Sequence, residues 1–246
     1  MFPNPPKKNL FQVRISYADE ATSLVKYVVD KLQIKDIGVF YQDDAFGVAG
    51  RAGVEKALSE YKVKINGIGT YQRNTVDVDK AVDELKKANP KAVYMQAVGK
   101  PGIEFIKKCA AKGFTPLFLG QSALGSLQLR DAIGSLPVEM YISEIVPWPL
   151  DNSMPLIKSY QKDMAAAGKK SLDFFTLEGY MGAVLFVEGL KRNGRDLTRA
   201  SLSKTLEGIH DFDMGGVKAS FSPTKHFALD TNFVFHLKGG QLTPVK

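Results

Sequence analysis

The fold is decided by one stretch, Ile37-Gly38-Val39-Phe40-Tyr41-Gln42-Asp43-Asp44-Ala45-Phe46-Gly47. Its first five residues form a short apolar run, which is typical of a strand buried on both faces. The polar residues that follow indicate a tight turn, and an Asp there can cap a helix by accepting a backbone N–H bond. The stretch therefore predicts the strand-turn-helix step from which α/β domains are built.

The same step recurs through the first half of the chain. Further apolar segments predict strands at residues 65–71, 92–95, 117–119 and 140–146. The segments around them carry apolar residues at helical spacing, over residues 21–32, 54–61, 81–88 and 103–110. This alternation predicts a doubly wound, Rossmann-like lobe with a mostly parallel sheet and helices on both faces. Right-handed crossovers place its strand-to-helix loops at the carboxyl edge, where open α/β sheets bind ligands.

The second half has a different pattern. Residues 153–209 predict three helices with no strand between them, and the longest begins near Asp173 and ends at Gly194. Strands are expected at 217–221 and 233–237, with a tight Gly-Gly turn leading into 242–245. Three helices without a sheet of their own need another apolar layer against which their apolar faces can pack. Together with a proline-rich start that shows no signal segment, this favours a chain that lacks an N-terminal portion.

Composition and charge exclude several classes of protein. Hydrophobic residues make up 44% of the 246 residues, and no stretch reaches the roughly 18 to 20 apolar residues that span a bilayer. The net charge is +7, but basic residues are scattered as pairs, which argues against nucleic-acid binding. The single cysteine, Cys109, lies in a helical pattern and is expected to be a buried thiol. The three histidines lack metal-ligand spacing, so we expect no metal and no cofactor.

Two glycine motifs resemble catalytic signatures only superficially. Residues 120–125 read G-x-S-x-x-G, one residue longer than the nucleophile elbow of hydrolases. Gly47, Gly50 and Gly53 do not form G-x-G-x-x-G, and the two acids before them would repel a pyrophosphate. We therefore predict no catalytic residue, and we expect Ser122 to face whatever fills the carboxyl edge.

Four segments together identify a family resemblance. They read VFYQDDAFG at 39–47, TYQRNT at 70–75, LEGYM at 177–181 continuing to EGLKRNG at 188–194, and FDMGGV at 212–217. In this order and spacing they resemble type I periplasmic solute-binding proteins, best known as leucine/isoleucine/valine receptors of ABC importers. The resemblance covers nearly the whole chain.

The resemblance implies two α/β lobes that close on a small-molecule ligand in the cleft between them. Proteins of this family are usually longer than this chain, so the opening part of the first lobe would be missing. On this basis we expect an N-terminal tail or crossover at 1–11 and a complete α/β lobe at 12–147. The returning helices of the other lobe are expected at 148–212, and C-terminal strands and a crossover at 213–246.

The resemblance also implies ligand-contacting positions. Phe46 occupies the place of an aromatic residue that packs against the ligand, and Gln96, Ala97 and Val98 follow the third strand, where a second contact lies. After the fourth strand the amino-acid binders carry an acid that pairs with the ligand's ammonium group. This chain has Ser122 there, beside Gln121.

That departure puts a zwitterionic ligand in doubt, because a buried ammonium would lose a charge-assisted hydrogen bond. Glu178 or Asp43 could supply the missing charge; otherwise a carboxylate, an aromatic acid or an amide is favoured. Tyr180 matches an aromatic residue of the returning segment, with helix packing as the alternative role.

These observations predict an extracytoplasmic, periplasmic solute-binding protein of an ABC importer, without catalytic activity, which contacts a small ligand and the permease subunits. One alternative is the ligand-sensing domain of a signalling receptor. Another is a doubly wound α/β enzyme, for which Ser122→Ala would abolish turnover. If the first lobe is incomplete, exposed apolar helix faces would also favour self-association.

Overall fold

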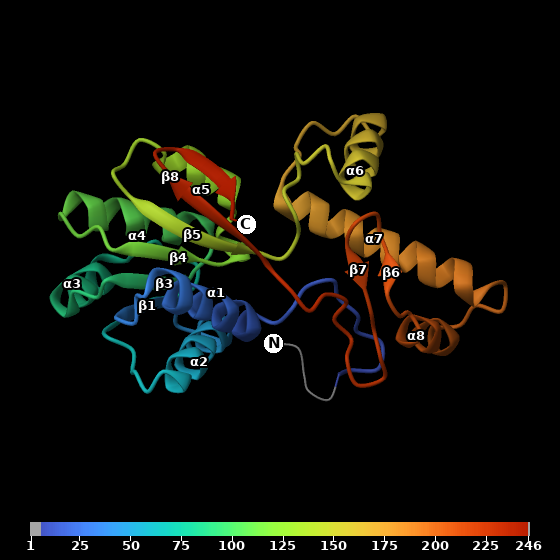
Figure 1. Ribbon diagram of the computed structural model, residues 1–246, viewed down its shortest axis with the longest axis horizontal. Helices are drawn as coiled ribbons and strands as arrows, with labels where there is room; N and C mark the ends of the chain where they lie inside the picture. The colour runs from blue at the N-terminus through green and yellow to red at the C-terminus, as the bar shows by residue number, and fades with distance from the viewer. Residues whose placement is uncertain (1–5, 246) are drawn as a thin grey trace. The chain divides into compact units, whose positions relative to one another are not determined.

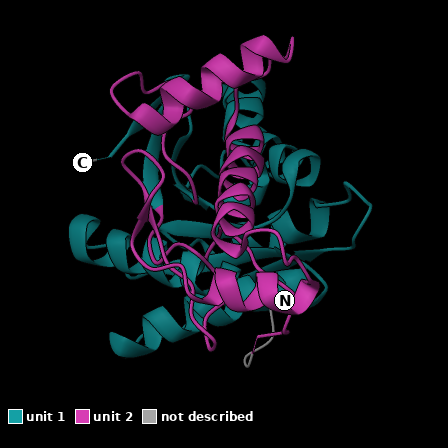
Figure 2. Cartoon of the chain, turned by 90° about the vertical axis from the view of Figure 1, so that its right-hand side faces the viewer, with its two compact units in different colours: residues 1, 16–144, 233–246 teal, residues 2–15, 145–232 magenta. Residues whose placement is uncertain are grey.

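The computed structural model describes residues 6–245, which form two compact units (Figure 2). The first unit consists of Ser16–Glu144 together with the C-terminal segment from Phe233. The second consists, among the described residues, of residues 6–15 and of Ile145–Asn232. Each unit buries apolar side chains of its own.

A seven-stranded sheet forms the centre of the first unit, in the order β2-β1-β3-β4-β5-β8-β9. The first five strands along this order are parallel, as the sequence predicts, and the last two are antiparallel. The strands are β1 (Ile37–Gln42), β2 (Ile68–Tyr71), β3 (Ala92–Gln96), β4 (Leu117–Gly120), β5 (Glu139–Glu144), β8 (Phe233–Lys238) and β9 (Gln241–Pro244). The strand expected over 65–71 begins only at Ile68, because Gly67 has a φ of 91°, outside the β region.

Helices cover both faces of this sheet (Figure 1). On one face, α1 (Tyr17–Leu32) and α2 (Ala45–Glu60) pack on alternate residues of the central strands, such as Val39, Tyr41 and Tyr94. On the other, Phe105 of α4 (Gly99–Ala111) stacks on Phe40 of β1, with ring centroids 3.9 Å apart. The unit also contains α3 (Asp79–Ala88), a 3₁₀ turn η1 (Ser122–Leu124) and α5 (Ser126–Ile133).

The first turns of α1 and α2 lie at the carboxyl edge of the sheet. Of the two Asp residues in the turn, Asp44 caps α2: its Oδ1 accepts from the N–H groups of Phe46 (2.9 Å) and Gly47 (3.2 Å). Gly53 lets the two helices approach closely, because a Cβ there would lie only 2.8 Å from Cβ of Ala21. This contact holds the start of α1 beside the loop that follows β1.

The second unit contains the three predicted helices, α6 (Pro155–Ala166), α7 (Phe174–Asn193) and α8 (Arg199–Glu207). A capping box of Asp173 and Thr176 begins α7, and Gly194 follows its last residue, as predicted. The strand expected over 217–221 is only two residues long: β7 (Lys218–Ala219) pairs with β6 (Phe212–Asp213). It ends early because the next N–H groups, of Ser220 and Phe221, bond to Ala228 and Ile209 instead.

The N-terminal segment belongs to this second unit. Gln12 pairs in parallel with Phe227, and the His226 ring stacks on Phe11 at 4.1 Å. The Nδ1 atom of His226 lies 3.1 Å from the carbonyl oxygen of Leu10. Residues 1–5 of the expected tail lie outside the described residues. Within residues 6–245, no helix combines the length and the apolar character needed to cross a membrane.

Candidate functional site

Aromatic side chains meet where α1 and α2 begin. Phe46, the second residue of α2, is half-buried and contacts the edge of the Tyr17 ring, with centroids 4.8 Å apart and planes at 87°. Both residues lie at the carboxyl edge of the parallel sheet, the usual ligand position in open α/β folds. Phe46 therefore has the placement that the sequence predicts, with Tyr17 as an unpredicted neighbour.

The buried carboxylate of Glu20 contacts the segment that follows β4. Glu20, one turn after Tyr17, is 0% exposed. Its Oε1 accepts from the backbone N–H of Ser122 at 2.7 Å, and its Oε2 accepts from the Ser122 hydroxyl at 3.1 Å. A second buried carboxylate, Glu144 at the end of β5, accepts from the hydroxyl of Ser126. An acidic group thus lies at the Ser122 position, but α1 supplies it.

Two buried amide side chains, Gln96 and Gln121, lie at the ends of β3 and β4, and Gln121 connects these ends. Gln121 donates through Nε2 to the carbonyl oxygen of Ala97 at 2.7 Å, and its Oε1 accepts from the N–H of Ala123 at 2.6 Å. Gln96 is 0% exposed and accepts through Oε1 from the Tyr94 hydroxyl at 2.9 Å. Its Nε2 has no hydrogen-bond partner among residues 6–245. Because buried donors are nearly always paired, this amide N–H is a candidate contact for a bound molecule.

Gln96 lies against the helix that carries Phe46. A Cβ at Gly50 would overlap the Gln96 amide, so only glycine leaves room for it there. The structure therefore brings five of the predicted residues to one edge of one sheet: Phe46, Gln96, Ala97, Gln121 and Ser122. Tyr17 and Glu20 of α1 contact members of this group.

A relay of hydrogen bonds connects Val98 to the turn between β1 and α2. Its N–H donates to the Tyr71 hydroxyl (3.3 Å), which donates to Oε1 of Gln42 (3.1 Å). Gln42 in turn donates through Nε2 to Asp44, the cap of α2, at 2.6 Å. Burial raises the pKa of Tyr71 to about 12, although the bond from Val98 acts in the opposite direction. The phenol therefore stays neutral, and able to donate, at physiological pH.

An open cavity of about 700 Å³ lies beside this relay. It is bounded by the end of β1, the loop after β2 and the start of α4. Val98, 38% exposed, is one of its apolar lining residues, and two cations, Arg73 and Lys100, also line it. The other lining residues are Gln42, Asn74, Thr75, Val76 and Pro101.

The remaining predicted residues have other partners. Glu178 belongs to the second unit and faces Arg14 at 3.8 Å; burial raises its pKa, and the Arg14 charge only partly offsets this. Tyr180 donates to Asp163 of α6 at 2.8 Å, a hydrogen bond between two helices of the second unit. Asp43 is exposed and accepts from Gln72 at 3.0 Å. The carboxylate bonded to Ser122 is therefore Glu20, rather than Glu178 or Asp43.

Tyr17 and Glu20 were missed by the sequence analysis, although one signal was present. Glu20 lies one turn before Leu24, on the apolar stripe of α1, where a charged residue is unexpected. Two of the three histidines have structural contacts: His226 bonds to the N-terminal segment, and His236 lies 2.7 Å from Glu139. No group of three or more potential metal-ligating side chains occurs among the residues that the structure describes.

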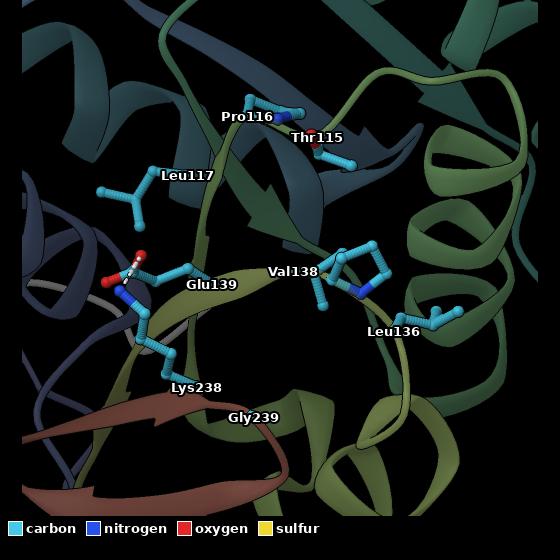
Figure 3. Close-up of a pocket in the computed structure, with 9 residues that line it drawn as sticks. Thr115, Pro116, Leu117, Leu136, Val138, Glu139, Lys238 and Gly239 are labelled. Carbon is cyan, nitrogen blue, oxygen red and sulfur yellow. Dashed lines mark ion pairs between the residues drawn. The ribbon is translucent and has the colours of Figure 1, made fainter.

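A second cavity, of about 490 Å³, lies at the opposite, amino edge of the sheet (Figure 3). Its polar wall is the ion pair of Glu139 and Lys238, with Nζ 3.0 Å from Oε2. Its other lining residues are mostly apolar: Thr115, Pro116, Leu117, Leu136, Pro137, Val138 and Gly239. Because it lies at the edge remote from Phe46, we do not assign the ligand to it.

Glu139→Gln is expected to lower the free energy of unfolding at pH 7 by less than about 1 kcal/mol, since the pair is more than a third exposed. Burial disfavours the charged carboxylate, but hydrogen bonds from Lys238 and His236 outweigh it, so the pKa of Glu139 lies below its ordinary value. The stabilisation is therefore present above the ordinary carboxyl range, about 4.3, and is lost as pH falls through the lowered pKa. Urea unfolding between pH 7 and pH 2 checks this.

The exposed Glu84, whose one ion pair within residues 6–245 is with Lys80 at 3.8 Å, is the control. We expect Glu84→Gln to change the free energy of unfolding little at any pH. A difference between wild type and Glu139→Gln that grows as the pH falls would contradict the assignment.

The comparison with protein families decides the identity. The family model described as periplasmic binding protein matches residues 3–241. The chain belongs to the periplasmic binding protein family. Among curated members, Leu/Ile/Val-binding protein homolog 7 of Brucella abortus is 23% identical over 224 residues, which cover 85% of this chain and 55% of that protein. The chain thus spans about half the length of the curated relatives it matches.

Solved structures of periplasmic binding proteins share the fold. A possible leucine/isoleucine/valine-binding protein from Rhodopirellula baltica has a TM-score of 0.89 and 27% identity, covering 97% of this chain and 67% of its own. A solute-binding protein of an ABC transporter from R. palustris, solved in complex with benzoate, has a TM-score of 0.81 at 21% identity, over 97% and 65%. At that identity the second likeness shows the fold alone.

Proposed function

We propose that this chain is the ligand-contacting part of an extracytoplasmic solute-binding protein that delivers its ligand to an ABC importer. The observation that carries the proposal is the cluster at the carboxyl edge of the first unit. There, the Phe46–Tyr17 aromatic pair lies beside the buried polar groups of Gln96, Ser122 and Glu20. Ligand sites combine a mostly apolar lining with a few fixed polar groups, and this cluster has that character.

The ligand is a small amino-acid-like, carboxylate or aromatic compound. The curated relatives are named for leucine, isoleucine and valine, and one relative of the same fold was solved with benzoate. A side chain or ring of either kind can pack on Phe46, while Gln96 and Ser122 contact its polar end, beside Ala97 and Val98. Glu178 and Tyr180 stay candidate contacts of the second unit.

The partners follow from this role. Ligand contacts favour one arrangement of the protein through differential affinity, and the permease subunits recognise that arrangement outside the cytoplasm. We propose no nucleic-acid partner and no cofactor. Self-association is a further prediction, supported by three exposed apolar side chains of α7: Phe175, Phe186 and Val187.

The test is thermal unfolding with branched-chain and aromatic amino acids, aromatic acids, small carboxylates and amides, on the 246-residue chain and on the product of its complete gene. A ligand at a hundredfold excess over its Kd stabilises the folded state by about 2.7 kcal/mol. Phe46→Ala should weaken binding about tenfold or more, as expected for an aromatic anchor worth over about 1.4 kcal/mol.

Val48→Ala is the matched control, because Val48 lies on the same helix and is 51% exposed. It should leave the affinity unchanged. If no compound shifts the midpoint of either protein, the transport role is contradicted for these ligands. If Phe46→Ala binds as tightly as wild type, the site assignment is wrong.

A further inference from the structure

Two cations, and no acid among the described residues, line the cavity of about 700 Å³ at the carboxyl edge of the first unit. Arg73, in the loop after β2, is 72% exposed and lies 3.8 Å from the carboxylate of Asp44, the outer limit of an ion pair. That carboxylate also caps α2 and accepts from Gln42. Lys100, in the first turn of α4, is exposed and enters no ion pair within residues 6–245. Because charge of one sign in a concave wall attracts the opposite sign from solution, this cavity favours an anion.

The helix that carries Lys100 begins in a way that adds to this preference. Its N-cap residue, Val98, makes no side-chain capping bond, and its first turn contains no acid. The N-terminal end of a helix carries a partial positive charge, which anions stabilise and which makes a lysine there unfavourable. Lys100 therefore adds positive charge to a helix end that already lacks compensation, and a bound anion would relieve both.

Hydrogen bonds fix the two segments that bound the cavity. In the loop after β2, Thr75 donates its N–H (3.2 Å) and its hydroxyl (2.7 Å) to the carbonyl oxygen of Gln72. Asn74, between them, has a left-handed φ of 64°, a conformation that Asn tolerates better than most residues. At the start of α4, the N–H of Val98 donates to the Tyr71 hydroxyl at 3.3 Å. The lining is thus held in place before a ligand arrives, which lowers the entropy cost of binding.

The lining also has an apolar part. Val76 is 51% exposed and Val98 is 38% exposed, and Pro101 lies beside Lys100 in the sequence. Sites for small molecules combine apolar lining with a few polar groups, whereas an inorganic ion gains nothing from exposed valines. The guanidinium of Arg73 has the planar fork that matches a carboxylate. An organic acid, with a carboxylate on an apolar body, therefore fits this lining best.

We propose that this cavity is an anion subsite that holds the carboxylate of a small organic acid, with Arg73 and Lys100 as its charged contacts and Val76 and Val98 against its apolar part. The assignment rests on the proposed function and deepens it, since Val98 directly follows the end of β3 where the candidate site lies. It names the ligand class as a carboxylate and gives the first unit a contact for that group.

The test is calorimetry on the product of the complete gene, with three acids and their uncharged amides: leucine and leucinamide, 4-methylpentanoate and 4-methylpentanamide, and benzoate and benzamide. Wild type should bind at least one acid about tenfold or more tightly than its amide, the range of a charge-assisted hydrogen bond. Acetate and inorganic phosphate, which have little or no apolar body, should bind at least about tenfold more weakly than that acid.

The variants remove the two charges without filling the cavity. Arg73→Gln and Lys100→Gln together should reduce the preference for the acid about tenfold or more, with the affinity for the amide unchanged. Each single variant should lose part of the preference, and Arg73→Lys should retain more of it than Arg73→Gln. Lys107→Gln is the matched control, because Lys107 is an exposed cation of the same helix outside the cavity lining, and it should leave the preference intact.

Unfolding of the ligand-free variants checks that the fold is unaffected. Lys100→Gln should keep or raise the melting temperature, because it removes a cation from a helix N-terminus. Three results would overturn the subsite: acids and amides that bind wild type equally, an intact preference in the double variant, or phosphate that binds as tightly as the acids. In those cases weaker binding by Phe46→Ala would leave the proposed function standing. A wild-type protein that binds none of the six compounds contradicts the proposed function, and the subsite with it.

Discussion

Gly47→Ala is expected to lower the free energy of unfolding by about 3 kcal/mol, the upper range for forcing extra volume into a packed site. A Cβ on Gly47 would overlap the carbonyl oxygen of Gln42 and lie 2.6 Å from the Tyr41 ring. Backbone cannot move aside cheaply here, because Gln42 pairs with Tyr71 of β2 and the preceding residue pairs with both neighbouring strands. The strain falls on the turn that carries Phe46.

Gly179→Ala is the matched control for this variant. Gly179 lies inside α7, and a Cβ there would meet nothing within 4 Å. Alanine favours the helix over glycine by about 1 kcal/mol, so this change should be neutral or stabilising. Guanidinium unfolding followed by circular dichroism measures both variants. Equal effects of the two substitutions would show that the turn at Gly47 is not as tight as described.

Phe105→Ala is expected to cost about 3 to 5 kcal/mol, the range for truncating a buried aromatic ring. The Phe105 ring is fully buried, stacks on Phe40 at 3.9 Å and contacts the edge of Phe118 at 6.4 Å. Its removal would leave a void between α4 and the sheet, at the face opposite α1 and α2. Losing the packing and the aromatic contacts together makes this one of the largest single effects expected in the first unit.

The control for Phe105→Ala is Phe186→Ala on α7. Phe186 is 51% exposed, so its truncation should change the free energy of unfolding by no more than about 0.5 kcal/mol. The comparison requires that both variants show the same dependence of the unfolding free energy on denaturant concentration. A changed slope would signal altered compactness rather than lost packing. A loss below about 1 kcal/mol for Phe105→Ala would mean that α4 repacks and that the ring stack contributes little.

Local patterns were sufficient for most of the architecture. The apolar runs that begin at Ile37 and Ala92 are strands β1 and β3, and the stripe over 21–32 is the buried face of α1. Such patterns are readable because burial on one face or both leaves a period in neighbouring residues. The short helix α5 was missed, since eight residues with two buried apolar side chains, Leu129 and Ile133, leave too short a period to recognise.

Strand pairing between segments far apart in the chain could not be predicted from the sequence. The strand at Phe233–Lys238 was expected, but its antiparallel position beside β5 joins residues nearly a hundred positions apart, as His236 and Tyr141 show. Which edge of a sheet accepts a returning strand depends on the whole set of packed layers. No local periodicity carries that information.

The candidate site divides in the same way. By itself the sequence determined that Phe46, Gln96, Gln121 and Ser122 lie at or just after the ends of parallel strands, and parallel strands bring their carboxyl ends to one edge. Only the tertiary structure brought a carboxylate to that edge, because Glu20 reaches Ser122 across 102 positions, from a helix that precedes the first strand. A strand end is a local feature, whereas a carboxylate becomes part of a site only when the packing of α1 against α2 and the sheet buries it there.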